Sequence, residues 1–134
     1  MSEENKVLIR RLIREVEKGT PDTIEGMIDE VLAPDFVDHD LRPDHEPDRE
    51  SYKQDLSEDR AALSNFDITI EDQIAEGDKV VTRLTWRGTH DRGTFMGMAP
   101  TDKKIEVTAI FIHRIVEGKV KEEWSASDTL DKLR

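Results

Sequence analysis

The spacing of hydrophobic residues changes once along this chain, close to Phe66. Before that point apolar residues recur three and four positions apart, which is the spacing of one face of an α-helix. After it they alternate with polar residues, as in strands that bury one face. Helices followed by antiparallel strands predict an α+β domain, with the helices packed on one face of a sheet. No internal repeat or linker interrupts the pattern, so we expect a single domain over residues 1–134.

An amphipathic helix is expected over residues 5–18, where Leu8, Leu12 and Val16 lie on one apolar stripe. Ser2 is a candidate cap at its start, and Gly19 is expected to end it in a left-handed conformation.

Thr20 and Pro21 predict the cap and the first turn of a second helix, because proline is favoured there. Pro34 is expected to end this helix. A short extended segment over 35–40 and a polar loop follow, and a third helix is expected over 49–63.

Four strands are expected in the remainder of the chain, separated by turn signals. The first strand begins at Phe66, and the others cover residues 79–90, 104–116 and 119–127. The turns between them are Gly77–Asp78, the segment 91–103 and Glu117–Gly118.

The composition limits the function classes. With 31 acidic and 20 basic side chains the formal charge is -11, which repels nucleic acids and anionic membrane surfaces. The absence of cysteine excludes disulfides, zinc-thiolate sites and thiol nucleophiles. No signal peptide or membrane-spanning run of about 18 apolar residues is visible, so we expect a cytoplasmic protein.

Three segments resemble a known family: LAPDFVDHD, GTHDRGTFMGMAPTDKKIEVTAI and FIHRIVEGKVKEEWSASDTL. They are similar to the SnoaL-like polyketide cyclases of the nuclear transport factor 2-like superfamily. The resemblance implies an α+β cone with N-terminal helices on a strongly curved antiparallel sheet and a pocket between them. It also implies a homodimer and cofactor-free chemistry on a polyketide-like ester.

The resemblance also assigns site positions through the VEGK turn. The acid/base aspartate of the cyclases falls at Ser125, one pocket histidine at Glu123 and another at Phe111. An asparagine of the family falls at Asp38. The acid/base residue and both histidines are therefore replaced in this chain.

Glu123 and Asp38 are the candidate catalytic residues. Glu123 and Ser125 are two positions apart on a strand, so their side chains share a face. If that face is apolar, desolvation raises the carboxyl pKa towards the range of a general acid or base. In the alternative interpretation Glu123 is an exposed acid on a charged strand.

The other pocket candidates each have a structural alternative. His113 shares a strand face with Phe111 and is either a pocket residue or a hydrogen-bonded core histidine. Trp86 belongs to the core or the pocket wall. His39 follows Asp38 on an extended segment, so the two point to opposite faces. Asp128 matches an acidic position of the family or caps a short terminal turn.

A metal site from His39, Asp40 and His45 is conceivable, but its spacing matches no zinc or iron pattern, and we expect none. Nucleotide-binding glycine loops, the Gly-x-Ser-x-Gly elbow and His-Glu-x-x-His are absent from the sequence.

Two functions remain open. The first is acid/base chemistry, such as isomerisation, dehydration or cyclisation, on an apolar carbonyl compound. The second is a ligand-binding or dimeric structural protein that has lost catalysis with the aspartate now replaced by Ser125.

Overall fold

The computed structural model describes residues 2–40, 46–129 and 132. Within these residues it contains three helices and one five-stranded sheet. In chain order they are α1 (Ser2–Lys18), α2 (Pro21–Val31), β1 (Leu32–Asp38), α3 (Arg49–Ala61), β2 (Leu63–Glu76), β3 (Lys79–His90), β4 (Lys104–Val116) and β5 (Lys119–Ser127). The expected order of helices and strands is confirmed.

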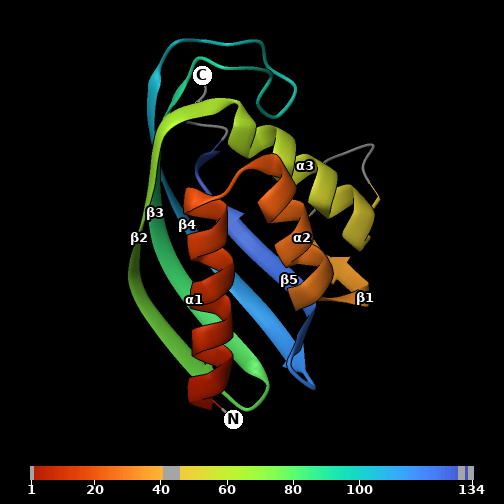
Figure 1. The fold of residues 1–134 in the computed structure, drawn as a ribbon. Coiled ribbons are helices and arrows are strands. Elements are labelled where there is room, and N and C mark those ends of the chain that lie inside the picture. The colour runs from red at the N-terminus through yellow and green to blue at the C-terminus, as the bar shows by residue number, and fades with distance from the viewer. Residues whose placement is uncertain (1, 41–45, 130–131, 133–134) are drawn as a thin grey trace.

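The sheet has the strand order β1-β5-β4-β3-β2, and all three helices lie on one side of it (Figure 1). Strands β2 to β5 pair antiparallel, as expected. Strand β1 pairs parallel with β5 at the edge, which makes the sheet mixed. The reason is connectivity: β2 to β5 follow one another through turns or a short connection, whereas β1 reaches β5 only after most of the chain has intervened.

Irregular pairing accompanies the bend of the sheet around the helices (Figure 1). The register between β2 and β3 shifts twice, between Ser64 and Asp67 and between Ile70 and Asp72. Bulges of this kind bend a strand and increase its twist. The concave face that results is the one that faces α1 and α3.

Three details at the helix ends differ from expectation. Helix α1 already includes Ser2, so Ser2 does not precede the helix as a cap. Gly19 does not adopt a positive φ, and its N–H instead donates to the Glu15 carbonyl oxygen at 2.7 Å, which continues the helical pattern. Glycine is needed there for space, because a Cβ would lie 2.4 Å from that oxygen. Helix α2 ends at Val31, and Pro34 lies in edge strand β1, a position that proline tolerates.

The start of α2 is as expected. Thr20 is its N-cap, and it forms a reciprocal capping box with Thr23, in which each side chain accepts from the other residue's backbone N–H. Pro21 occupies the first turn.

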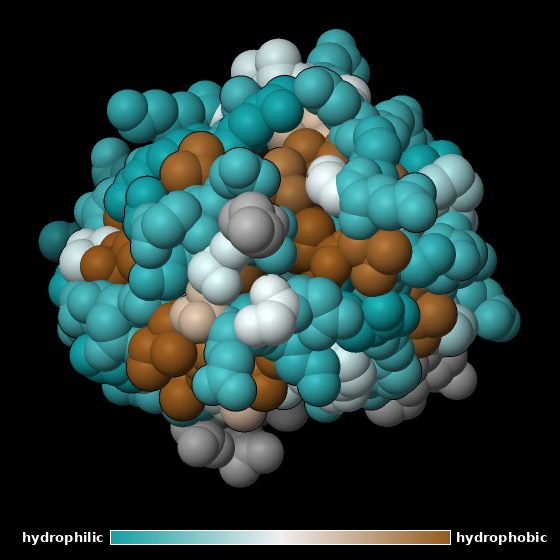
Figure 2. All heavy atoms as spheres, turned by 90° about the horizontal axis from the view of Figure 1, so that it is seen from below, coloured by the Kyte–Doolittle hydropathy of each residue, from teal (hydrophilic) through white to brown (hydrophobic). Residues whose placement is uncertain are grey.

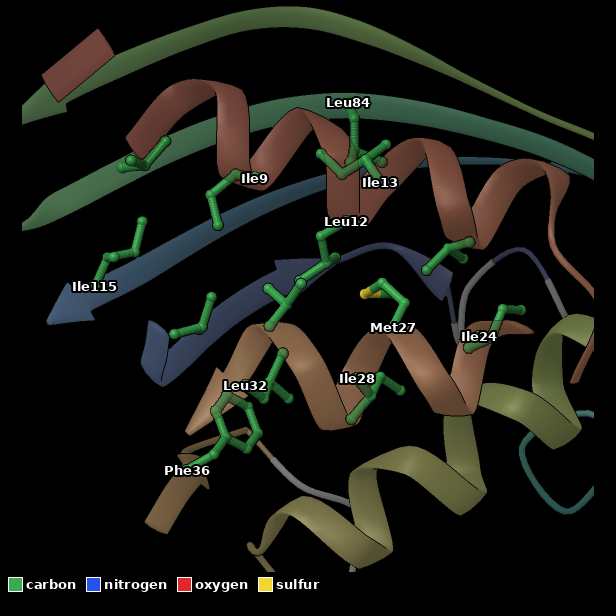
Figure 3. Packing of buried hydrophobic residues seen from close by; sticks show 14 of the residues in the cluster. Ile9, Leu12, Ile13, Ile24, Met27, Ile28, Leu32, Phe36, Leu84 and Ile115 are labelled. Carbon is green, nitrogen blue, oxygen red and sulfur yellow. The ribbon is translucent and has the colours of Figure 1, made fainter. Parts of the chain in front are cut away.

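The apolar faces of α1 and α2 pack together against residues of the sheet (Figure 3). Ile9 and Leu12 of α1 and Ile28 of α2 are at most 6% exposed. Each fully buried side chain of this size contributes roughly 1.5–3 kcal/mol relative to an exposed one. This core fixes the two helices on the sheet and fills only part of its concave face.

The surface reflects the charged composition. Hydrophilic residues cover most of the face shown in Figure 2, and hydrophobic residues form smaller areas between them. None of the described helices has the length and apolar character required to cross a bilayer.

Candidate active site

A cavity of about 320 Å³ lies between helices α1 and α3 and the concave face of the sheet. This size is within the range of small-molecule sites. Its walls are largely apolar, and residues of both helices, of all five strands and of the segment after β3 contribute to them. The apolar lining includes Leu12, Ile13, Leu56, Leu84, Trp86 and Phe95.

Strand β5 carries polar groups into this cavity. Because side chains alternate along a strand, Glu123, Ser125 and Ser127 all face inward and line the cavity. Glu123 and Ser125, which were expected to share a strand face, both line the cavity. Trp124, between them, points to the opposite face and stacks on His39.

The pairing of β4 with β5 brings a histidine to Glu123. His113 is the cross-strand partner of Glu123, and Phe111 is the partner of Ser125. Side chains of such pairs lie on the same face and within contact distance. The His113 Nε2 lies 2.8 Å from the Glu123 Oε1, and both residues are buried, at 2% and 4% exposure.

Tyr52 of α3 completes a buried network. Its hydroxyl donates to the same Glu123 oxygen at 3.0 Å, and its ring packs edge-on against Phe36. Burial, followed by the charges of Glu123 and Asp38, raises the pKa of the Tyr52 hydroxyl well above its usual value. Tyr52 is therefore a protonated donor at neutral pH, and it holds the Glu123 carboxylate from the helix side.

Asp38 is the second carboxyl of the site. It ends β1, where it is the parallel pairing partner of Glu123. Burial, and then the negative charge of Glu123, raise the pKa of Asp38 to about 6. A carboxyl with this pKa is present in both protonation states near neutral pH, as a general acid or base requires.

Asp40 connects the end of β1 to β5. Its N–H donates to the Asp38 Oδ1 at 3.1 Å, and its Oδ2 accepts from the Ser125 N–H at 2.6 Å. These bonds fix the Asp38 carboxyl beside the strand that carries Glu123.

The structure brings together six of the eight predicted site residues. The cavity is lined by Asp38, Trp86, Phe111, His113, Glu123 and Ser125. The other two lie outside the lining. His39 is on the outer face, where its Nε2 lies 2.9 Å from Glu122 Oε1. Asp128 accepts from the Thr108 N–H at 2.9 Å at the end of the sheet.

Tyr52 is the residue that sequence reasoning missed. Its spacing from Leu56 supports a helix over this segment but assigns the tyrosine no role. The available signal is the hydroxyl, since a buried tyrosine usually places its O–H on a hydrogen-bond partner. Tyr52 is also the one tyrosine of the chain.

Within the described part of the chain, no group of three or more His, Asp or Glu side chains is placed to hold a metal ion. His45, which the conceivable metal site included, lies outside the described residues.

Comparison with known proteins agrees with this architecture. The profile of the SnoaL-like polyketide cyclase family matches residues 7–134. The search of curated proteins found no match.

Several solved structures share the fold. The SnoaL-like protein of Jannaschia sp. CCS1 is 21% identical with a TM-score of 0.83, over 98% of this chain and 90% of that one. TsrD of Streptomyces laurentii is 23% identical with a TM-score of 0.81, over 98% and 92%. IdmH of Streptomyces antibioticus, a proposed polyketide cyclase, is 30% identical with a TM-score of 0.76, over 96% and 95%. The chain therefore belongs to the SnoaL-like polyketide cyclase family.

Proposed function

We propose that the protein catalyses cofactor-free proton transfer next to the carbonyl group of an apolar small molecule, with Asp38 as the acid/base. The observation that carries this proposal is the Asp38 carboxyl. Its pKa is about 6, and it lies beside a buried Glu123 at the edge of an apolar cavity. A group that exchanges protons at neutral pH needs a pKa close to that pH.

The proposed step begins when the Asp38 carboxylate removes a proton from the carbon next to the carbonyl. The electrons of that C–H bond form the C=C bond of an enolate, and the carbonyl oxygen takes the negative charge. Asp38, now protonated, returns the proton to the same or a conjugated carbon, which completes an exchange or an isomerisation. In the related cyclisation the enolate carbon attacks a second carbonyl of the same molecule instead, and the alkoxide that forms takes the proton from Asp38.

Glu123 supports this step through its charge. Held by Tyr52 and His113, it raises the pKa of Asp38 and makes the Asp38 carboxylate a stronger base. The apolar walls, including Trp86 and Phe111, keep water away from the reacting carbon.

The test uses 2-tetralone, an apolar ketone with exchangeable hydrogens next to its carbonyl. Hydrogen-deuterium exchange in D₂O is followed by proton NMR with and without protein. We expect the protein to accelerate exchange, and Asp38→Asn to reduce the acceleration by roughly 10²-fold or more. The matched control is Asp35→Asn, an exposed acid on the same strand, which should exchange at the wild-type rate. Equal rates for the wild type and Asp38→Asn would contradict the proposal.

The second candidate is a ligand-binding protein without catalysis. It is favoured by Ser125, whose hydroxyl stands in the cavity wall where the family resemblance places the acid/base aspartate. Binding of 2-tetralone without accelerated exchange would support this candidate. A homodimer and a cytoplasmic location stay predictions, and analytical ultracentrifugation tests the first.

A further inference from the structure

The polar part of the cavity lining is strongly acidic. Six carboxyl side chains line the cavity among the described residues, on β1, β5, α3 and the segment before α3. They are Asp38, Asp40, Glu46, Asp55, Asp59 and Glu123. Glu123 is 4% exposed, so at least one of these charges is held away from water.

Arg60 is the one permanently positive side chain in the described lining, and three of its five N–H donors are bonded to backbone carbonyl oxygens. Its Nε donates to the Val16 carbonyl at 2.9 Å, and its Nη2 to the Glu17 carbonyl at 2.9 Å. Its Nη1 donates to the Leu63 carbonyl at 3.2 Å, and the guanidinium lies 4.5 Å from the centre of the Phe66 ring. Arg60 thus caps the end of α1, and these contacts hold its guanidinium against the protein.

His113 adds an acceptor to the same lining. Its Nδ1 has no hydrogen-bond partner among the described residues, although the side chain is buried. In the neutral ring whose Nε2–H donates to Glu123, Nδ1 carries a lone pair. In that tautomer the described lining offers an imidazole acceptor beside the carboxylate acceptors.

We propose that the ligand of this cavity is an apolar compound that carries a protonated amine, and that Asp38 and Glu123 bind its ammonium group. This goes beyond the proposed function: it uses the same cavity, but an ammonium bound to Asp38 would occupy the proposed base and lower its pKa, so the amine is a ligand of the cavity and not the substrate of the proton transfer. An ammonium group neutralises two neighbouring carboxylates whose solvation is incomplete, and it supplies three N–H donors. A carboxylate or phosphate beside Asp38 and Glu123 would face like charges from these two residues.

The experiment compares three probes that share one apolar body: 1-naphthylmethylamine, 1-naphthalenemethanol and 1-naphthoate. Isothermal titration calorimetry at neutral pH measures their dissociation constants at low and at moderate salt. We expect the amine to bind roughly tenfold or more tightly than the alcohol, and the naphthoate to bind more weakly than the alcohol. The preference for the amine should persist at moderate salt, because the carboxylates are partly shielded from solvent ions.

Variants distinguish binding of the amine at Asp38 and Glu123 from general attraction of a cation to a protein of charge -11. Asp38→Asn and Glu123→Gln should each reduce the preference for the amine over the alcohol. Asp72→Asn changes the net charge by the same amount at an exposed position paired with Arg83, so it should keep the preference. Unchanged affinity for the alcohol and an unchanged circular dichroism spectrum show that the variants fold. If Glu123→Gln does not fold, the effect of Asp38→Asn on the preference for the amine is sufficient for the test.

The inference is overturned if the alcohol or the naphthoate binds as tightly as the amine, if none of the probes binds, or if Asp38→Asn keeps the full preference. These results are distinct from the failure of the proposed function. The exchange of neutral 2-tetralone can succeed without any amine preference, and the amine can bind in a protein that exchanges no protons.

Discussion

Replacing Asp38 with asparagine should stabilise the fold at neutral pH and leave its stability nearly unchanged at about pH 4. Burial and the charge of Glu123 raise the pKa of Asp38 from 3.8 to about 6. An acid with a raised pKa stabilises the folded state below its unfolded pKa, and this contribution is lost as the pH rises through the folded pKa. Ionised Asp38 therefore disfavours folding above about pH 6, whereas asparagine stays neutral.

The magnitude follows from the shift. About two pKa units correspond to about 3 kcal/mol at 1.36 kcal/mol per unit, without screening. Because Asp38 is only half-buried, solvent screens part of this energy, and we expect a gain of about 1–2 kcal/mol in the free energy of unfolding. Asparagine keeps an oxygen that can accept from the Asp40 N–H, so the local hydrogen bond is conserved.

Urea unfolding at pH values from 4 to 8 measures the difference between the two proteins. The gain of Asp38→Asn should grow between about pH 4 and pH 6 and stay level above that. The control is Asp35→Asn on the same strand, where the hydrogen bond from Lys121 lowers the pKa of the carboxyl. Asp35→Asn should therefore not increase the free energy of unfolding at neutral pH. A difference between the wild type and Asp38→Asn that is independent of pH, or that has the opposite sign, would refute the reasoning.

Three further substitutions test single contacts. Glu123→Gln should lower the pKa of Asp38 by roughly one unit, because the charge of Glu123 is, after burial, the second cause that raises this pKa. NMR titration of the Asp38 carboxyl measures the pKa, and an unchanged value would contradict the coupling. Tyr52→Phe should lower the free energy of unfolding, measured with urea, by about 1–3 kcal/mol, because buried Glu123 loses a hydrogen bond. A negligible decrease would show that this bond does not stabilise the fold. Gly19→Ala should lower the free energy of unfolding by about 1–3 kcal/mol, because the new Cβ would lie 2.4 Å from a backbone oxygen. Gly26→Ala has open space around it and should raise the free energy of unfolding by about 0.5–1 kcal/mol, so melting temperatures that shift in the same direction would exclude the steric explanation.

Much of the fold follows from local pattern. The predicted bounds of strand β4 agree with the structure, because apolar and polar residues alternate along it and the Glu117–Gly118 turn fixes its end. Both residues of this turn adopt positive φ. The helix ends were less accurate. The space around Gly19 is set by the path of the backbone at the end of α1 and by Thr23 and Ile24 at the start of α2, which hydrophobic spacing does not contain.

For the candidate site, the sequence predicted which side chains share a strand face. The shared face of Glu123 and Ser125 follows from their spacing, and so do the opposite faces of Asp38 and His39. Tyr52 was missed because its contact with Glu123 joins residues 71 positions apart, which helical spacing does not reveal.

The sequence by itself determined which residues form helices and strands and which side chains share a face, because both depend on neighbours three or four positions away in a helix and two in a strand. Only the tertiary structure decided that the end of β1 lies beside β5, so that Asp38 meets Glu123 while α3 brings Tyr52 to the same oxygen. The raised pKa of Asp38 depends on this meeting, because desolvation and charge coupling act through space and are independent of separation along the chain.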